Sequence, residues 1–233
     1  EIAKASANNP WKQRNKHTRY SRRKTDKLLN FGDQQVPVVI GNMDLKSEHK
    51  LDADYYFQED KWVSKDGGSQ FHQLLLEQLK NENYSKDKNY FLSFTASEWN
   101  TEWTAKTSSI DKLILVLKKP EHCNIDDIHQ TIYKINESGL SLPLILKVES
   151  TENSENKLMI QTAVMTGPFF LKGQLDGLWI DSSNFNTNEI SFGILQASRQ
   201  RVSKTEYIAC PSCGRTLFNI QEKLQDIKKK TTA

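Results

Sequence analysis

The chain has 233 residues, with 32 Lys or Arg against 29 Asp or Glu, and its formal net charge is +3. This length is enough for one large domain or two smaller ones with a buried core. Hydrophobic residues make up 36% and charged residues 26%, and no apolar run approaches the roughly 20 residues that cross a bilayer, so composition excludes membrane-spanning, fibrous and fully disordered proteins.

The charge is unevenly distributed along the chain. Residues 1–30 hold nine basic and two acidic side chains, and residues 199–233 hold eight and three, whereas residues 31–198 hold fifteen and twenty-four. The basic start is typical of a solvated linker or of an arm on an acidic surface, and it lacks the interleaved aromatic residues of a nucleic-acid groove. Because the chain begins with Glu1 and shows no signal peptide, we interpret it as a piece of a longer or processed protein.

Hydrophobic periodicity predicts alternating strands and helices. Short apolar runs indicate strands, and apolar residues that recur every three to four positions indicate helices. The expected strands are 36–40, 54–57, 90–94, 110–117, 142–148, 177–181 and 205–209. The expected helices are 71–79, 125–135, 158–170, 188–202 and 216–229, and we expect Trp99 and Trp103 to share a further helix face as packing residues.

The clearest unit is the strand–helix–strand sequence between residues 110 and 148. Asn124 is a good N-cap for the central helix, and Gly139 suits its end. Nearly continuous apolar strands on both sides of a helix indicate a βαβ unit in a parallel sheet. Since the alternation continues along the chain, the sequence predicts an α/β fold, with a partial or complete (β/α) barrel over residues 36–183.

A C-x-x-C pair, Cys210 and Cys213, is the sharpest chemical signal. Two thiolates at this spacing can converge on one soft metal, and a helix beginning near Thr216 directs its positive dipole end toward them. Spacing alone leaves three interpretations open: half of a zinc ribbon, a thioredoxin-like dithiol, or part of an iron–sulfur site. The chain has no second C-x-x-C, and its third cysteine, Cys123, lies far upstream next to His122, where we interpret it as structural.

Other common motifs are absent from the sequence. The five histidines form no H-x-x-x-H or H-E-x-x-H pattern, and there is no G-x-G-x-x-G or Walker A sequence. We therefore expect neither a histidine metal site nor nucleotide binding.

Residues 192–221 resemble the beginning of the iron–sulfur domain of the 4-hydroxy-3-methylbut-2-enyl diphosphate synthase family in its long, three-domain form. The segment includes T-E-Y-I-A-C-P-S-C-G-R-T-L-F-N-I-Q, which ends at Gln221. Further resemblance lies in Y-S-R-R at residues 20–23 with V-P-V-V-I at 36–40, in residues 110–148, and in residues 167–180. Lys172 and Leu175 depart from the family's D-G-x-G-D-G turn, and Val202 stands where polar residues are commoner.

The resemblance implies an oxidoreductase that opens a cyclic diphosphate to an allylic diphosphate in isoprenoid biosynthesis. Its [4Fe–4S] cluster is held by three cysteines and a glutamate, of which Cys210 and Cys213 match the first two. The other two ligands and the first barrel domain have no match in this chain, so the chain is expected to be inactive alone and to hold no catalytic residue. An arginine of this segment meets the diphosphate in the family; Arg201 is the better match, and Arg199 is the second candidate.

The resemblance also implies a domain organisation and partners. Residues 1–30 would be a basic linker, 31–187 an inserted barrel-like domain, and 188–233 the first strand and helix of an incomplete α/β iron–sulfur domain. The expected partners are ferredoxin or flavodoxin as electron donor, the cyclic diphosphate substrate and a second copy in a homodimer, with no nucleic acid and no membrane. The expected location is the bacterial cytoplasm or a plastid. The alternative is a stand-alone α/β binding module with a zinc or dithiol knuckle at Cys210 and Cys213.

Overall fold

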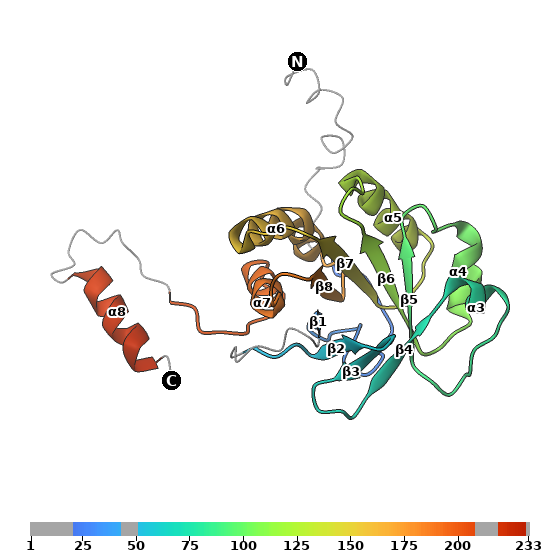
Figure 1. The fold of residues 1–233 in the computed structure, drawn as a ribbon, viewed down its shortest axis with the longest axis horizontal. Helices are drawn as coiled ribbons and strands as arrows, with labels where there is room; N and C mark the ends of the chain where they lie inside the picture. Colours follow the sequence, from blue (N-terminus) through green and yellow to red (C-terminus); the bar gives the residue numbers. More distant parts are fainter. Residues whose placement is uncertain (1–20, 43–50, 208–218, 232–233) are drawn as a thin grey trace, which may run out of the picture. The chain divides into compact units, whose positions relative to one another are not determined.

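Eight strands close into a barrel at the centre of the fold (Figure 1). The computed structural model describes residues 21–42, 51–207 and 219–231. The strands are β1 (Val38–Asn42), β2 (Tyr55–Gln58), β3 (Lys61–Ser64), β4 (Gln70–Leu74), β5 (Tyr90–Thr95), β6 (Leu113–Lys119), β7 (Leu144–Ser150) and β8 (Gly177–Ser182). The described helices are α3 (Leu76–Lys80), α4 (Thr101–Ser108), α5 (Ile125–Glu137), α6 (Glu155–Leu171), α7 (Asn188–Ala197) and α8 (Ile220–Thr231).

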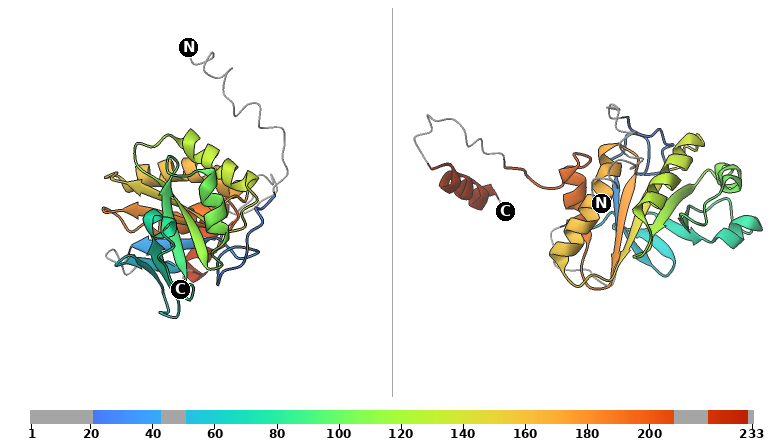
Figure 2. Two further views of the ribbon diagram at one scale, coloured as in Figure 1. Left: turned by 90° about the vertical axis from the view of Figure 1, so that its right-hand side faces the viewer. Right: turned by 90° about the horizontal axis from the view of Figure 1, so that it is seen from above.

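The barrel combines a parallel part with an antiparallel hairpin. Strands β4 to β8, β1 and β2 pair in parallel, and β8 closes against β1. Strand β3 pairs antiparallel with β2 on one side and with β4 on the other. The predicted α/β barrel is therefore confirmed as a closed barrel, but a β-hairpin stands where a regular (β/α) barrel has strand–helix units. Figures 1 and 2 show helices α4, α5, α6 and α7 outside the barrel, on the side of its parallel strands.

Aromatic side chains fill the inside of the barrel. Trp62 stacks on Phe91 with ring centroids 4.1 Å apart, and Trp179 meets Trp62 edge-on at 5.8 Å. Phe31, which precedes β1, is fully buried against Trp62 and Phe71. The interior is thus a packed core, as in other eight-stranded barrels, and the segment before β1 closes one end of it.

A second apolar layer lies between the strands and the helices. Helix α5 buries Ile128, Ile132 and Ile135 on the face that the sequence predicts. The side chain of Asn124 accepts the backbone N–H of Asp126, and Gly139 follows the helix with φ 71°. The predicted cap, stripe and end of this helix are confirmed.

The helix expected over residues 71–79 is wrong for its first half. Residues 70–74 form β4, and only Leu76–Lys80 form a helix, α3. Phe71 lies opposite Trp62 across the β3–β4 pair and points into the barrel. The spacing of Phe71 and Leu74 fits a helical stripe, but burial of Phe71 in the aromatic core favours the strand.

Trp99 and Trp103 do not share a helix face. Trp99 precedes Asn100, the N-cap of α4, whereas Trp103 lies inside that helix. Both indoles are nonetheless buried, and Trp99 packs against Phe94 at 4.7 Å. Their predicted role as packing residues is confirmed, although the helix begins later than expected.

Helix α7 ends at Ala197, five residues before the predicted end. Arg199 takes a left-handed conformation with φ 60°. Its N–H donates to Gln196 O at 3.0 Å, and the N–H of Gln200 donates to Leu195 O at 2.9 Å. This pair of bonds is the Schellman motif, which ends helices and usually places glycine where Arg199 stands.

We expect Arg199→Gly to raise the free energy of unfolding by about 0.5–1 kcal/mol, because glycine adopts the left-handed conformation without strain. The greater conformational entropy of glycine in the unfolded chain offsets only part of this stabilisation. Urea unfolding at constant pH measures the change. The matched control is Gln200→Gly, whose backbone is not left-handed and which should lower stability. An Arg199→Gly variant that is less stable than the parent contradicts the assignment of the helix end.

The chain divides into two compact units between Arg201 and Val202. Of the strand expected at 205–209, residues 205–207 are described and are not in a strand. The last helix, α8, spans Ile220–Thr231 where 216–229 was expected, and residues 216–218 lie outside the described part. The predicted domain boundary at 187/188 stays a prediction, although α7 packs on α6 and on β1.

Candidate functional site

The two cysteines that the sequence singles out, Cys210 and Cys213, lie outside the described residues. Within residues 21–42, 51–207 and 219–231, no three His, Cys, Asp or Glu side chains are grouped so that they could hold a metal ion. The third cysteine, Cys123, is partly buried just before α5, and burial, together with Asp127, raises the pKa of its thiol. The structural role expected for Cys123 stays a prediction.

Arg201 lies at the end of the barrel unit and is bound there by Asp54. Its Nη1 and Nη2 donate to the two carboxylate oxygens of Asp54 at 2.5 and 2.9 Å, and Nη1 also donates to Pro37 O at 3.1 Å. The guanidinium lies 4.8 Å from the ring centroid of Phe192. A guanidinium that pairs with both oxygens of a carboxylate and also packs against an aromatic ring is well suited to connect two structural elements.

Asp54 connects Arg201 to a strand of the barrel. Its Oδ2 also accepts the backbone N–H of Val39 at 2.8 Å, so one carboxylate connects β1 with the segment after α7. The side chains of Asp54 and Arg201 are only 13% and 20% exposed. In this structure the donors of Arg201 thus face Asp54 and Pro37, and a phosphate would have to compete with that carboxylate for them.

Arg199, the second arginine candidate, has an exposed side chain at the left-handed turn that ends α7. The two arginines therefore differ in environment although they are two residues apart. Their predicted contact with a diphosphate stays a prediction.

A buried carboxylate, Asp176, ties the segment before β1 to the start of the barrel. It is 3% exposed, and its Oδ2 accepts the N–H of Leu144 at 2.9 Å while Oδ1 accepts the hydroxyl of Thr25 at 3.3 Å. Arg22 and Arg23 approach it at 3.4 and 3.6 Å. Burial raises the pKa of Asp176, and the Leu144 N–H and the two arginines oppose that rise.

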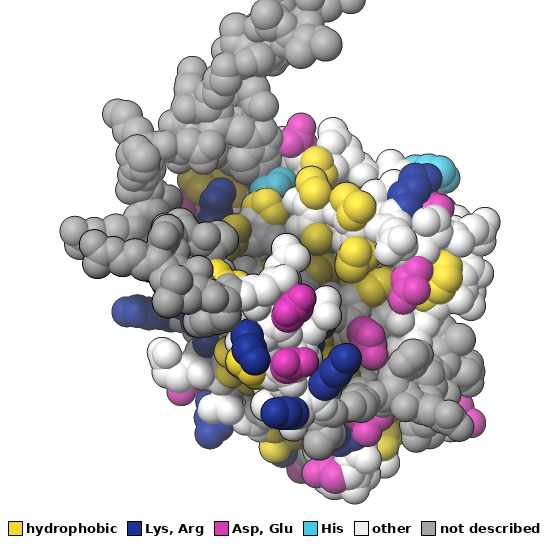
Figure 3. Space-filling view, turned by 90° about the vertical axis from the view of Figure 1, so that its left-hand side faces the viewer, with side chains coloured by type: hydrophobic (Ala, Val, Ile, Leu, Met, Phe, Trp, Pro, Cys, Tyr) yellow, Lys and Arg dark blue, Asp and Glu magenta, His cyan; other side chains and the backbone are white. Residues whose placement is uncertain are grey.

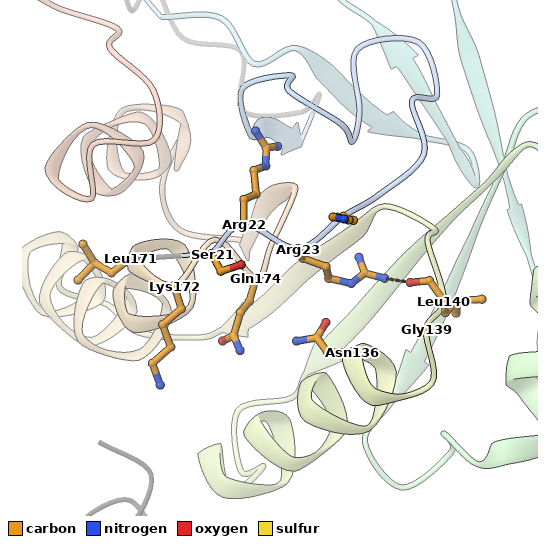
Figure 4. Close-up of a pocket in the computed structure, with 10 residues that line it drawn as sticks. Ser21, Arg22, Arg23, Asn136, Gly139, Leu140, Leu171, Lys172 and Gln174 are labelled. Atoms are coloured by element: carbon orange, nitrogen blue, oxygen red, sulfur yellow. Dashed lines mark hydrogen bonds between the residues drawn. The ribbon is translucent and has the colours of Figure 1, made fainter. Parts of the chain in front are cut away.

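Arg23 also bonds two carbonyl groups after α5, with Nη1 donating to Leu142 O and Nη2 to Leu140 O, both at 2.7 Å. It lines a cavity of about 610 Å³ together with Asn136, Lys172 and Gln174 (Figure 4). Burial lowers the pKa of the Arg23 guanidinium, and the charge of Asp176 counteracts this. The cavity lies where two helix C-termini and the start of the barrel meet, which is the end of such barrels that usually serves stability.

The turn before β8 explains the departure from the family's glycine pattern. Gly173 takes the left-handed conformation with φ 65°, whereas Leu175 does not and is 3% exposed in the apolar core. Gly173 thus provides the left-handed position and Gly177, where a Cβ would lie 2.8 Å from Val38 O, permits the close approach to β1, whereas Leu175 serves packing.

The opposite end of the barrel, where the parallel strands have their carboxyl ends, carries a closed polar network. Lys147 on β7 pairs with Asp181 on β8 at 2.7 Å and with Glu149 at 3.2 Å, and its ammonium lies 4.3 Å from the Trp179 ring centroid. Asn42 on β1 donates to Asp181 at 2.7 Å and accepts the indole N–H of Trp179 at 3.1 Å. Catalytic groups of such barrels cluster at this end, and here the Lys147 ammonium offsets one of the two carboxylate charges of Glu149 and Asp181.

Sequence reasoning did not single out Asp54, Asp176 or Lys147. Each is a charged residue at or inside an apolar strand, at 54 before Y-Y-F, at 176 before G-L-W-I and at 147 within L-I-L-K-V. Such a residue must find a partner when it is buried, and that is the signal that could have identified all three.

Comparison with curated proteins finds several relatives that carry the same name. The chain is 28% identical over 241 residues to the 4-hydroxy-3-methylbut-2-en-1-yl diphosphate synthase (flavodoxin) of Bacteroides thetaiotaomicron, an alignment that covers 91% of this chain and 38% of that protein. The synthase of the same name from Parabacteroides distasonis is 36% identical over 126 residues, which cover 52% of this chain and 21% of that protein. The one from Chlorobaculum tepidum is 33% identical over 101 residues, 42% of this chain and 14% of that protein.

These relatives confirm the resemblance predicted from the residues. The chain matches these relatives along most of its own length but spans only between 33% and 38% of theirs. No protein-family model matches the chain. In the described residues, no helix is both long and apolar enough to cross a membrane.

Proposed function

We propose that this chain is part of a 4-hydroxy-3-methylbut-2-en-1-yl diphosphate synthase that reductively opens a cyclic diphosphate to an allylic diphosphate in isoprenoid biosynthesis. The observation that carries the proposal is similarity to proteins of that name along 91% of the chain. The closed barrel agrees with the barrel-like domain that the resemblance implies.

In this proposal Cys210 and Cys213 supply two of the four ligands of a [4Fe–4S] cluster. Thiolates are the ligands that such clusters take, and the C-x-x-C spacing brings two of them together. The third cysteine and a glutamate would come from the longer polypeptide, so the donor set fits the cluster but is incomplete in this chain. Held by these thiolates, the cluster would supply single electrons and a Lewis-acidic iron.

The barrel's part is to support the site rather than to react. Its polar network at the carboxyl end is internally paired, with Lys147 between Asp181 and Glu149. Asp54 holds Arg201, the last residue of the barrel unit, which lies nine residues before Cys210 in the sequence. We propose that the barrel positions the start of the cluster domain, with no catalytic residue of its own.

The names of the relatives favour flavodoxin over ferredoxin as the electron donor. We further propose a cytoplasmic homodimer in a bacterial host, or a plastid protein in a eukaryotic one. For the diphosphate we propose Arg201 and Arg199 as contacts, Arg201 by exchanging the Asp54 carboxylate for phosphate oxygens.

The test is turnover of the cyclic diphosphate by the complete polypeptide that contains this chain, purified without oxygen and supplied with reduced flavodoxin. We expect formation of the allylic diphosphate, and loss of more than 99% of the rate in Cys213→Ser. Cys123→Ser is the matched control and should retain the rate. A protein that binds one zinc, contains no sulfide and leaves the substrate unchanged supports the stand-alone binding module instead.

A further inference from the structure

The cavity at the start of the barrel (Figure 4) contains two polar atoms that the fold leaves without a partner. In the described part of the chain, four buried side-chain nitrogen or oxygen atoms have no hydrogen-bond partner, and two of them, Arg23 Nε and Asn136 Oδ1, belong to residues that line this cavity. The Arg23 side chain is only 7% exposed. Because an unpartnered buried polar group is costly, a ligand that bonds both atoms gains affinity here.

The backbone groups around the cavity are already paired. The N–H groups of Gly139, Lys172 and Gln174 donate to carbonyl groups in the last turns of α5 and α6. The two Nη atoms of Arg23 donate to carbonyl groups after α5, both at 2.7 Å. The side chains, rather than the helix ends, therefore decide what the cavity binds.

The charged side chains around the cavity are cationic. Its lining contains Arg22, Arg23, Lys24 and Lys172, and none of the described residues that line it is acidic. Asp176, which contacts both arginines, offsets one of these charges, and the C-terminal ends of α5 and α6 together offset about one more. About two positive charges remain. Figure 3 shows basic and acidic side chains interspersed over one side of the molecule, so a lining of one sign is not the general pattern of this surface.

The cavity has an exposed cationic mouth and a buried base. Lys24 and Lys172 are exposed, whereas Leu140 is 6% exposed and the two unpartnered atoms are buried. Figure 4 shows the side chains of Lys172, Gln174 and Asn136 projecting toward one space. The volume of about 610 Å³ lies within the range of small-molecule sites, which is about 300–1,000 Å³.

We propose that this cavity binds a small organic phosphate that carries a hydroxyl group. The phosphate oxygens pair with Lys24 and Lys172 and accept the Nε–H of Arg23, while the hydroxyl donates to Asn136 Oδ1. Residues 1–20, which hold five basic side chains and one acidic side chain, do not supply such an anion. The inference does not depend on the proposed function, because it uses residues of the barrel unit alone.

Isothermal titration calorimetry of the 233-residue chain with glycerol phosphate, at constant ionic strength, tests the site. We expect saturable binding of one molecule per chain. Asn136→Asp should weaken binding at least tenfold, because it places a negative charge next to the phosphate, and Lys172→Gln should weaken it at least threefold. Lys134→Gln, which lies on α5 but outside the cavity, is the matched control and should bind as tightly as the parent.

Two further measurements identify the ligand and the site. Inorganic phosphate should bind at least threefold more weakly than glycerol phosphate, because it has no alcohol hydroxyl for Asn136. Arg199→Gln should leave the affinity unchanged, which separates this cavity from the arginines proposed for the cyclic diphosphate. Urea unfolding shows whether each variant is folded. No binding to the parent, equal affinity for the two phosphates, full affinity in folded Asn136→Asp and Lys172→Gln, or loss of affinity in Arg199→Gln would each overturn the proposal.

Discussion

Asp176→Ala lowers the free energy of unfolding of the chain by about 4 kcal/mol, because it leaves two partly buried arginines without their carboxylate and the Leu144 N–H without its acceptor. The same carboxylate connects residues 22–25 to the start of β7 and precedes β8 directly. Its loss therefore releases the segment that carries Phe31 into the barrel core. Urea unfolding followed by tryptophan fluorescence measures the change, since Trp62 and Trp179 lie in that core.

The control is Asp111→Ala, an exposed aspartate in the turn before β6 that should change stability by less than about 0.5 kcal/mol. Asp176→Asn should fall between the two, because an amide oxygen can still accept from Leu144 but carries no charge for the arginines. If Asp176→Ala is as stable as the Asp111 control, Asp176 does not hold the amino-terminal segment in place.

Breaking the Asp54–Arg201 pair is the second large effect. We expect Asp54→Ala to lower the free energy of unfolding by about 3 kcal/mol, because it leaves both the Arg201 guanidinium and the Val39 N–H without their acceptor. Arg201→Ala should lower it by about 2 kcal/mol. The loss of stability in the double variant should be smaller than the sum of the losses in the two single variants by about 1.5 kcal/mol, because both substitutions remove the same contact. Unfolding of the four proteins of this cycle in urea gives the coupling directly.

The same variants separate anchoring from substrate binding. If Arg201 only anchors the segment before Cys210, Arg201→Ala and Asp54→Ala should lower turnover by the complete polypeptide in parallel with stability, with little change in KM. If Arg201 meets the diphosphate, Arg201→Ala should raise KM at least tenfold while Asp54→Ala, which releases the guanidinium, should not. A coupling below about 0.3 kcal/mol contradicts the anchor itself.

Much of the barrel could be predicted from the sequence because its parallel strands are nearly continuous apolar runs. The β6–α5–β7 unit is an example, in which Asn124 and Gly139 mark both ends of the helix. Local pattern and tertiary burial agree there, so short-range signals were enough.

The hairpin was missed because its signals are not local. Phe71 and Leu74 fit a helical stripe, and only the facing Trp62 on β3 makes the strand the better solution. The early end of α7 was missed for a related reason, since Arg199 takes a conformation for which sequence patterns favour glycine.

In the candidate site, too, local features could be predicted from the sequence and long-range pairings could not. The C-x-x-C pair is a local motif and was identified from spacing and resemblance, whereas the partner of Arg201 lies directly before β2, 147 positions away in sequence. Pairings over such distances depend on the closed barrel, and one sequence does not reveal them.

The iron and sulfide content of the complete polypeptide, purified without oxygen, tests the central claim most directly. With Cys210 and Cys213 as two ligands of one cluster, the parent protein and Cys123→Ser should each contain about four iron and four sulfide per chain. Cys210→Ser and Cys213→Ser should each lose most of both. Full iron and sulfide in the Cys210 and Cys213 variants, or none in the parent, would contradict it.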